Sequence, residues 1–478
     1  MPQQNKVDIV FAGLPWVADG SPMMAPAVLK SIVEQEGYSS VSLDLNISFF
    51  KRMLELHSND EDLIHFTVSH KITKREDTPK IVNLFSEEIS YMAEQILSYD
   101  PTHIGLTVFS MDSRIVTKYL TFRLRQLAPE KKIVIGGPGL STTMGDNHSD
   151  FAEELYQLGL IDCYIIGRGK DGILEYLKGN LVHNDTKMEY TSHLNMYSEL
   201  ELPYPNFKDY DFNQYINKYL PILESLGCVK NCDFCNIIEY WPKYQYKGSS
   251  PLFDEMVYQS KKYGINHFIM KNSLCNGNMR DFKTWLQLVA DYNQENPDNQ
   301  LSWTSYFILR SSHFHPESMF ELIQKANGIL SFGVETPIER VRNALGKEFS
   351  NEDIDYHLDM CRKYKIPVNL LLIGSQPGET TEDYKFIQQW IKDRIHYASD
   401  PIIWMNLHFA NVISGTGWDR KIDDEKKKAI VSEPGINYYT SSPDLFAQEG
   451  IVDIESRLEH WDVLKEITKP FQVSFPSI

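Results

Sequence analysis

Short apolar runs rich in β-branched residues alternate with amphipathic helical patterns along most of the chain. This alternation constrains the fold strongly, because strands joined by helices form βαβ units and parallel sheets. In the first ~200 residues we expect a doubly wound, Rossmann-like sheet, whose ligands bind beyond the carboxyl ends of the strands. The predicted strands of this α/β domain are Val7–Leu14, Val41–Leu45, His103–Phe109, Lys132–Ile135 and Cys163–Ile166.

A second strand–helix series follows a polar, proline-containing linker. Six repeats predict a partial (β/α)6 barrel, with its chemistry at the C-terminal ends of the strands. Its predicted strands are Tyr219–Leu226, Asn266–Met270, Leu301–Phe307, Ile329–Val334, Val368–Ile373 and Ile402–Phe409. We therefore expect a Rossmann-like domain at 1–180, a linker at 181–214, the barrel at 215–412 and a small C-terminal extension at 413–478.

The charge and hydropathy of the chain exclude several classes of partner. The net charge of −18 over 478 residues repels nucleic acid and anionic membranes, so we expect neither as a partner. No apolar run approaches the roughly 20 residues that span a bilayer. The apolar start Val7–Leu14 lacks the flanks of a signal peptide. We expect a cytoplasmic protein.

The cysteines point to a metal centre. Six cysteines are too few for a disulfide scaffold, but Cys228, Cys232 and Cys235 fall within eight residues. A zinc site usually has four ligands, and no second cysteine pair exists here; His267 leaves a Cys3His zinc site or a structural metal knuckle open. Three thiolates can instead hold three irons of a [4Fe–4S] cluster and leave the fourth iron to an exogenous ligand.

The spacing Cys228-x3-Cys232-x2-Cys235, with Phe234 before the last cysteine, resembles the signature of the radical S-adenosylmethionine (SAM) superfamily. Further segments resemble the superfamily's barrel motifs in the same order. They are Met270–Asn278, Trp303 with Arg310, Phe332–Thr336 with the downstream Lys347, Ile373–Glu382, and Gly415-Thr416.

The resemblance implies a division of labour among these residues. Cys228, Cys232 and Cys235 would hold the cluster, and SAM would chelate the open iron and be cleaved reductively to a 5′-deoxyadenosyl radical. Phe234 would pack near the adenine, and the candidates for the methionine end or the ribose are Ser273, Arg310 and Glu335. An external electron donor such as flavodoxin or ferredoxin is implied.

The other three cysteines, Cys163, Cys275 and Cys361, are expected to be buried small hydrophobes. Cys275 is the exception, because its motif is expected at the barrel mouth. It is a candidate for a chemical role.

The first domain resembles the cobalamin (B12)-binding domain that precedes many radical SAM barrels. The turn at Gly136 and Gly137 would let the backbone approach a ligand closely, and Ser110 could donate a hydrogen bond to it. This arrangement would suit the buried dimethylbenzimidazole tail of cobalamin. The D-x-H-x-x-G motif that ligates cobalt in one class of cobalamin proteins is absent, so a domain that only shapes the substrate cleft remains the alternative.

Three functions follow from these patterns. The leading hypothesis is a cobalamin-dependent radical SAM methyltransferase that acts on an unactivated carbon of a small molecule or peptide. A radical SAM enzyme that catalyses a rearrangement, cyclisation or oxidation without methyl transfer is the second. A non-catalytic iron–sulfur or zinc protein is the third, and the negative net charge disfavours a tRNA-modifying role.

Overall fold

The computed structural model describes residues 6–16, 20–57, 59–60, 78–140, 149–167, 169–180, 200–215, 217–271, 273–399, 403–410, 412–413, 415–423, 425 and 454–471. The chain divides into two compact units, Met1–Pro221 and Ile222–Ser477. Of the predicted linker, residues 181–199 lie outside the described residues, as does most of the predicted C-terminal extension before residue 454.

The first unit is built on a five-stranded parallel sheet of order β2-β1-β3-β4-β5. Its strands are β1 (Ile9–Gly13), β2 (Ser40–Asp44), β3 (His103–Thr107), β4 (Lys132–Gly136) and β5 (Cys163–Ile165). The strand order reverses at β1 and β3, as in doubly wound folds. The predicted Rossmann-like sheet is confirmed.

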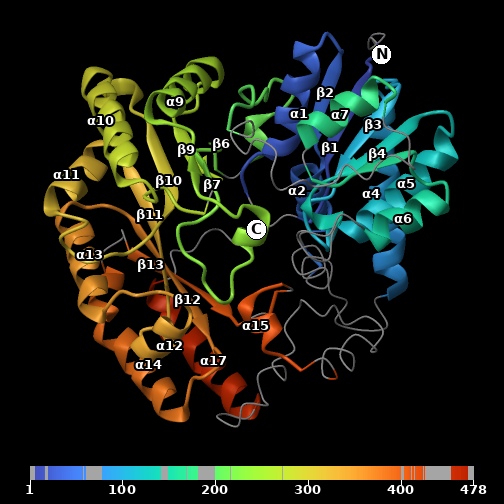
Figure 1. Cartoon of the computed structure of the whole chain (residues 1–478). Helices are drawn as coiled ribbons and strands as arrows, with labels where there is room; N and C mark the ends of the chain where they lie inside the picture. The colour runs from blue at the N-terminus through green and yellow to red at the C-terminus, as the bar shows by residue number, and fades with distance from the viewer. Residues whose placement is uncertain are drawn as a thin grey trace. The chain divides into compact units, whose positions relative to one another are not determined.

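Helices cover both faces of this sheet (Figure 1). They are α1 (Met24–Gln35), α2 (Leu45–His57), α4 (Thr78–Leu97), α5 (Ser113–Leu127), α6 (Asp150–Gln157) and α7 (Gly169–Leu177). Because successive strand side chains point to opposite faces, Ile9 and Phe11 pack with α1 and α7, whereas Val10 and Ala12 pack with α2, α4, α5 and α6. Burial on both faces explains why β1 reads as one continuous apolar run.

Residues 200–214, which the sequence assigns to a linker, and Tyr215, the first residue of the predicted barrel, pack against the first unit. The Tyr215 hydroxyl donates to the buried Asp44 carboxylate at 2.8 Å, and the Tyr210 hydroxyl donates to the carbonyl oxygen of Met23 at 3.0 Å. Burial raises the pKa of Asp44, although the hydrogen bonds from Ile47, Tyr215 and other groups oppose this shift. These contacts tie the segment to the end of β2 and to the start of α1.

The second unit carries a six-stranded sheet of order β13-β12-β11-β10-β9-β6, and its neighbouring strands from β9 to β13 are parallel. The strands are β6 (Tyr219–Ile222), β9 (His267–Met270), β10 (Ser302–Phe307), β11 (Gly328–Glu335), β12 (Val368–Gly374) and β13 (Ile403–Phe409). This is the partial barrel that the six predicted repeats require, because each strand is joined to the next by helical segments.

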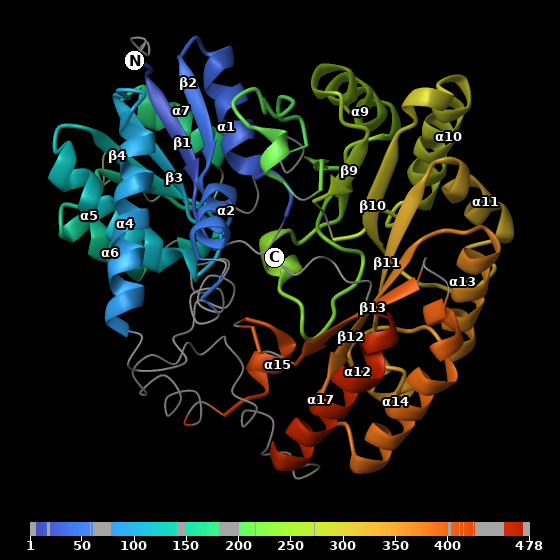
Figure 2. The same cartoon turned by 180° about the vertical axis from the view of Figure 1, so that it is seen from behind.

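Helices line the outer side of this sheet, as Figure 2 shows for α10, α11, α13 and α14. The helices are α8 (Ile237–Tyr240), α9 (Ser249–Tyr263), α10 (Met279–Glu295), α11 (Glu317–Lys325), α12 (Glu339–Ala344), α13 (Asn351–Lys363), α14 (Thr381–Asp393), α15 (Gly417–Arg420) and α17 (Ile454–Thr468). The last helix packs on α14, β12 and β13, so the described end of the C-terminal extension covers the outer face of the last two strands.

One predicted strand differs from the structure. The run Tyr219–Leu226 divides, because only Tyr219–Ile222 joins the main sheet as β6. Its end forms β7 (Ser225–Leu226), which pairs antiparallel with β8 (Gln245–Tyr246) twenty residues further on. That pairing is non-local, so the apolar pattern of the run could not indicate it.

Within the described ranges, no helix combines the length and hydropathy needed to cross a bilayer.

Candidate active site

The three clustered cysteines lie on one loop, whose base is closed by the pairing of β7 with β8. Gly227 begins the loop at a φ of +73°, and a Cβ there would lie 2.5 Å from the carbonyl oxygen of Lys243. Only glycine fits so close an approach with this backbone conformation. Further along, the Cys235 N–H donates to the carbonyl oxygen of Cys232 at 2.9 Å. The loop is thus folded back on itself, which gathers the cysteines.

The thiols share one half-buried environment. Burial raises the pKa of Cys228 and Cys235, and raises the pKa of Cys232 to about 11. The negative charges of Cys228 and Cys235 raise the pKa of Cys232 further, while the Lys347 ammonium lowers the pKa of all three thiols. Each thiol therefore lies within electrostatic reach of the same cation. Buried thiols of this kind ionise when a metal binds them.

The donor set fits an iron–sulfur cluster better than a single ion. In the part of the chain that the structure describes, no three His, Cys, Asp or Glu side chains converge on one metal position. His267, the possible fourth zinc ligand, instead hydrogen-bonds through both ring nitrogens, 2.8 Å from Ser302 Oγ and 2.9 Å from Thr304 Oγ1. Three thiols with no fourth ligand among the described residues fit a [4Fe–4S] cluster in which each thiolate binds a different iron.

The far side of the cysteine loop is fastened to the ends of α12 and α15. The Asp233 N–H donates to the carbonyl oxygen of Leu345 at 3.2 Å, and the Trp418 N–H donates to the carbonyl oxygen of Asp233 at 3.0 Å. The Phe234 ring lies 5.7 Å from the Trp418 ring, tilted by 47°, and the Lys347 ammonium lies 5.7 Å from its centroid. Phe234 is thus fixed between the cysteines and the end of the barrel, where the sequence predicted an adenine contact.

Glu335 ends β11 in a conformation that ordinary residues avoid. A bulge shifts the β11–β12 register between Gly333 and Glu335, and Glu335 has a φ of +63°. The Gln376 side-chain amide donates to the carbonyl oxygen of Glu335 at 2.9 Å and holds this turn from the next strand end. The Lys347 ammonium donates to Glu335 Oε1 at 2.6 Å and to the carbonyl oxygen of Gly333 at 2.7 Å.

The Lys347 ammonium is retained although its side chain is largely buried against Glu335. Burial lowers the pKa of Lys347, but Glu335 and the thiols of Cys232 and Cys228 outweigh that effect, so the net shift is upward. The pair places a cation beside the cysteines. Lys347 has two acceptors within the described chain, Gly333 O and Glu335 Oε1, and an ammonium has three N–H groups.

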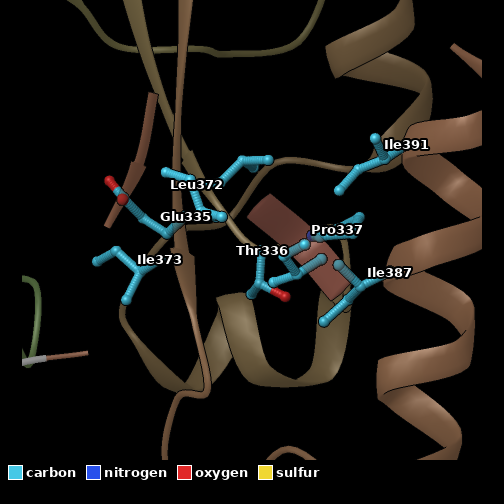
Figure 3. A pocket seen from close by; sticks show the side chains of 9 residues that line it. Glu335, Thr336, Pro337, Leu372, Ile373, Ile387 and Ile391 are labelled. Atoms are coloured by element: carbon cyan, nitrogen blue, oxygen red, sulfur yellow. The ribbon is translucent and has the colours of Figure 1, made fainter. Parts of the chain in front are cut away.

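The apolar side of this turn is closely packed (Figure 3). A cavity of only about 10 Å³ separates Glu335 and Thr336 from Ile387 and Ile391 of α14. The Glu335 carboxylate points away from these isoleucines in Figure 3. The Thr336 hydroxyl donates to the buried Glu379 carboxylate at 3.3 Å. This side therefore supports the turn, and the carboxylate of Glu335 is directed to the opposite side, toward Lys347.

Ser273 and Arg310 follow β9 and β10, so the topology brings them to the same edge of the sheet as Glu335. Burial lowers the pKa of Arg310, with the negative charge of Tyr244 opposing the shift. Among the described residues, no carboxylate forms an ion pair with Arg310. A half-buried guanidinium without a carboxylate suits an anionic ligand.

Cys275 lies deeper than the sequence suggested. It is 1% exposed, and burial raises the pKa of its thiol well above the ordinary value, with the neighbouring Glu224 charge adding to the shift. Glu224 is also 1% exposed, and its Oε1 accepts a 3.4 Å hydrogen bond from Ser305 Oγ. The thiol is therefore enclosed in a buried polar cluster, and a chemical role for it remains a prediction.

The first unit contains its own cavity, of about 290 Å³, at the carboxyl ends of β3 and β4. Gly136 and Gly137 line it, as the sequence predicted for a ligand site at this edge. Most of the other lining is apolar and comes from the sheet, α1 and α7, with Phe11, Val28, Ile32, Leu106 and Ile173 among its members. The size is at the lower end of ligand pockets.

The backbone of the glycine turn is in direct contact with Val108, the residue after β3. Gly137 has a φ of +115°, and a Cβ there would lie 2.5 Å from the carbonyl oxygen of Val108. Ser110 does not line the cavity: its hydroxyl donates to the carbonyl oxygen of Trp16 at 3.0 Å and accepts from the Ser113 N–H at 3.2 Å. The cobalamin contact of Ser110 stays a prediction.

The sequence reasoning missed Thr107, Phe109 and Lys170, which also line this cavity. Thr107 and Phe109 stand at the end of the predicted strand His103–Phe109, so the rule that ligands bind at strand ends could have found them.

Comparison with known proteins identifies the barrel domain and the fold. Residues 225–391 match the Radical SAM superfamily, so the barrel is a radical SAM domain and the domain implies a [4Fe–4S] cluster and SAM. No curated protein matches the chain in sequence.

Two solved enzymes share the fold of both units. The radical SAM methyltransferase TsrM from Kitasatospora setae, with cobalamin and a [4Fe–4S] cluster bound, is 16% identical with a TM-score of 0.58, over 89% of this chain and 79% of that one. The cobalamin-dependent SAM radical enzyme OxsB is 12% identical with a TM-score of 0.64, over 96% of this chain and 66% of that one. The fold is therefore that of cobalamin-dependent radical SAM enzymes.

Proposed function

We propose that this chain, whose residues 225–391 form a radical SAM domain, is a cobalamin-dependent methyltransferase acting on an unactivated carbon of a small molecule or peptide. The observation that carries the proposal is the cavity of about 290 Å³ at Gly136 and Gly137. It lies where doubly wound sheets bind their ligands, in a chain that also holds a three-thiol loop. The structural likeness to TsrM, a methyltransferase with cobalamin bound, supports the same reading.

In this proposal Cys228, Cys232 and Cys235 hold the cluster. When bound, the reduced cluster and SAM together supply a 5′-deoxyadenosyl radical that abstracts hydrogen from the substrate, and the protein's own task is to bind and orient. The Lys347 ammonium offsets negative charge beside Cys228 and Cys232.

The methionine end of SAM carries an ammonium and a carboxylate, and two side chains of the site complement them. Arg310 offers donors to the carboxylate in a paired geometry. Glu335 Oε1 accepts from Lys347, and Oε2 takes no hydrogen bond from another described residue, which leaves it for the ammonium or a ribose hydroxyl. Ser273 would contact the same end, and Phe234 would lie against the adenine.

In the first unit, the apolar lining of the cavity would take the dimethylbenzimidazole tail of cobalamin, which carries the methyl group between SAM and substrate. Gly136 and Gly137 line this cavity, and their backbone would contact that tail. The Ser110 hydroxyl donates to the carbonyl oxygen of Trp16 in this structure. It would exchange this acceptor for one on cobalamin when cobalamin binds.

An external electron donor completes the scheme. Val229, next to Cys228, is 43% exposed, so the cysteine loop can be approached from solvent. A small redox protein such as flavodoxin or ferredoxin would supply the electron there.

The test is anaerobic reconstitution with iron, sulfide and cobalamin, followed by SAM and a strong reductant. We expect bound iron and sulfide, a saturable optical change with cobalamin, and formation of 5′-deoxyadenosine. Protein that binds the cluster and cleaves SAM but never binds cobalamin would overturn the methyltransferase proposal and leave a non-methylating radical reaction. Inert protein with bound zinc would overturn both. With a substrate in hand, the product mass separates methyl transfer from rearrangement through a gain of one methylene unit.

A pair of variants on α1 tests the cavity itself. Ala25 lines the cavity at an exposed position, so Ala25→Trp should obstruct it and weaken cobalamin binding at least about tenfold without crowding the core. Gln35→Trp, exposed on the same helix but outside the cavity, is the matched control and should bind cobalamin normally. Equal binding by the two variants would contradict the assignment of the cavity.

A further inference from the structure

The side chain of Asn276 acts as a bridge between two strand ends. Asn276 is fully buried in the loop after β9. Its Oδ1 accepts from the Ile308 N–H at 2.9 Å, and its Nδ2 donates to the carbonyl oxygen of Ile308 at 2.9 Å. The amide thus pairs with the backbone after β10 as a neighbouring strand would, and it fixes the distance between the two segments.

The second Nδ2 hydrogen of Asn276 begins a chain of hydrogen bonds to α13. It points to His315 Nε2 at 3.3 Å, His315 Nδ1 lies 2.8 Å from His357 Nε2, and His357 Nδ1 lies 2.6 Å from the carbonyl oxygen of Asp353. A carbonyl only accepts, so His357 Nδ1 carries a proton and His357 Nε2 must accept from His315 Nδ1–H. His315 Nε2 is then left to accept from Asn276. Every donor in the chain has an acceptor when both rings are neutral.

An apolar shell encloses this chain. His315 and His357 are both fully buried, and the Phe307, Phe320 and Phe332 rings lie within 4.9 to 5.9 Å of one or the other imidazole. A fully satisfied polar network in such surroundings specifies one arrangement, because any shift leaves a buried group unpaired. The Tyr356 hydroxyl adds a further fastening, since it donates to the carbonyl oxygen of His315 at 3.0 Å.

The two segments that Asn276 joins each carry a candidate SAM contact. Ser273 precedes Asn276 by three residues, and Arg310 follows Ile308 by two. The Cys275 N–H donates to the carbonyl oxygen of Tyr306 at 3.0 Å, so the loop runs along the end of β10 up to the bridge.

We infer that Asn276 is a positioning residue, held by the His315–His357 pair, that sets Ser273 and Arg310 in register for the methionine end of SAM. The inference rests on the proposed function, because it takes both residues as parts of one SAM site. Neither histidine touches SAM in this scheme. Their role is to hold Asn276 in the one rotamer that pairs with Ile308.

The experiment measures SAM binding by equilibrium dialysis in the reconstituted full-length protein, together with the change in the electron paramagnetic resonance signal of the reduced cluster on SAM addition. Asn276→Ala should weaken SAM binding about tenfold and diminish that spectral change, while iron content and cobalamin binding stay at the wild-type level.

Two substitutions at His357 separate positioning from folding. His357→Phe removes the acceptor for His315 Nδ1–H and should weaken SAM binding in the same way, whereas His357→Gln retains an acceptor oxygen and should restore it. Trp285→Phe is the matched control: Trp285 is 1% exposed and packs 5.0 Å from Trp303, so the change disturbs the same core without touching the chain of hydrogen bonds.

Wild-type affinity for SAM in folded Asn276→Ala and His357→Phe would overturn the inference. So would a loss of SAM affinity that is proportional to the loss of thermal stability and that Trp285→Phe shows as well. If Asn276→Ala does not fold, the comparison of His357→Phe with His357→Gln decides by the same criterion. Wild-type protein that binds no SAM would refute the proposed function instead, and the inference with it.

Discussion

Glu335 and Lys347 form their 2.6 Å ion pair directly over the α-carbon of Gly333. A Cβ on Gly333 would lie 2.6 Å from Glu335 Oε1 and 2.7 Å from the Lys347 ammonium. The space that glycine leaves is therefore filled by the pair itself. Because the same ammonium faces the thiols of Cys228 and Cys232, the strand end, the cation and the cysteine loop form one electrostatic unit.

Gly333→Ala tests this unit. The added methyl group should displace Lys347 from Glu335, which weakens SAM binding about tenfold and lowers the free energy of unfolding by about 1–3 kcal/mol through overpacking. SAM titration and urea unfolding measure the two effects. Gly20→Ala is the control, since a Cβ there meets nothing within 4 Å; if both variants bind SAM equally, the ion pair does not support the site.

Gly227→Ala should prevent the cysteine loop from closing. Its φ of +73° and the 2.5 Å approach of the Lys243 carbonyl oxygen both disfavour a side chain. After reconstitution, we expect the Gly227→Ala variant to contain well under half of the wild-type amount of iron. Its cluster absorption in the visible range should be correspondingly weaker. Cys361→Ala, a substitution at a buried cysteine outside the loop, should lower stability but retain the iron. A Gly227→Ala variant with full iron content would contradict this account of the loop.

Stability should fall as the pH is lowered below about 6.5, the pKa of an unfolded histidine. Burial lowers the pKa of His357 to about 4, and burial together with the His357 charge lowers the pKa of His315 to about 2. Between pH 6.5 and these lowered pKa values, the unfolded state therefore binds more protons than the folded state. The stabilisation that is present above pH 6.5 is lost as the pH falls through this window.

The loss at pH 5.5 is about 1.5 kcal/mol for each of these histidines. Urea unfolding at pH 7.5 and pH 5.5 measures it, and His357→Gln, which removes one titrating group and keeps an acceptor, should reduce the difference by that amount. His267 and His460, whose pKa values burial lowers to about 4, act in the same direction. If the free energy of unfolding of His357→Gln depends on pH as in the wild type, His315 and His357 are not both neutral in the folded protein.

The strands were predictable because burial on both faces of a parallel sheet demands continuous apolar segments, as Ile9–Gly13, buried at all five positions, illustrates. Helix α2 was not assigned, because Leu45–His57 begins directly after β2 without a turn signal and ends in the polar stretch at 51–80. The end of β11 was placed at Val334, since no sequence pattern indicates a bulge or a positive φ at a glutamate.

The cysteine ligands were predictable from spacing, because three thiolates on one short loop have few uses other than a metal centre. The relationship of Asn276 to His315 and His357 was not, because the three residues are separated by 39 and 42 positions and neither histidine stands in a recognised motif. Buried polar networks depend on which side chains the folded core brings together, and local sequence carries little of that information.

Arg310 offers the most direct test of the SAM site. Its guanidinium is half-buried, and no described carboxylate neutralises it. If it binds the SAM carboxylate, Arg310→Gln removes a paired, charge-assisted contact and should weaken SAM binding by 10- to 100-fold, in line with about 1.5–3 kcal/mol for hydrogen bonds to charged groups. Because the variant also removes an unpaired buried charge, its thermal stability should be equal to or above that of the wild type.

Arg340→Gln is the matched control for Arg310→Gln. Arg340 pairs with Asp383 on the surface at 2.6 Å, so its substitution should affect SAM binding little. Reduced stability with unchanged SAM affinity in Arg310→Gln would mean that Arg310 serves the fold and that the carboxylate of SAM is held elsewhere.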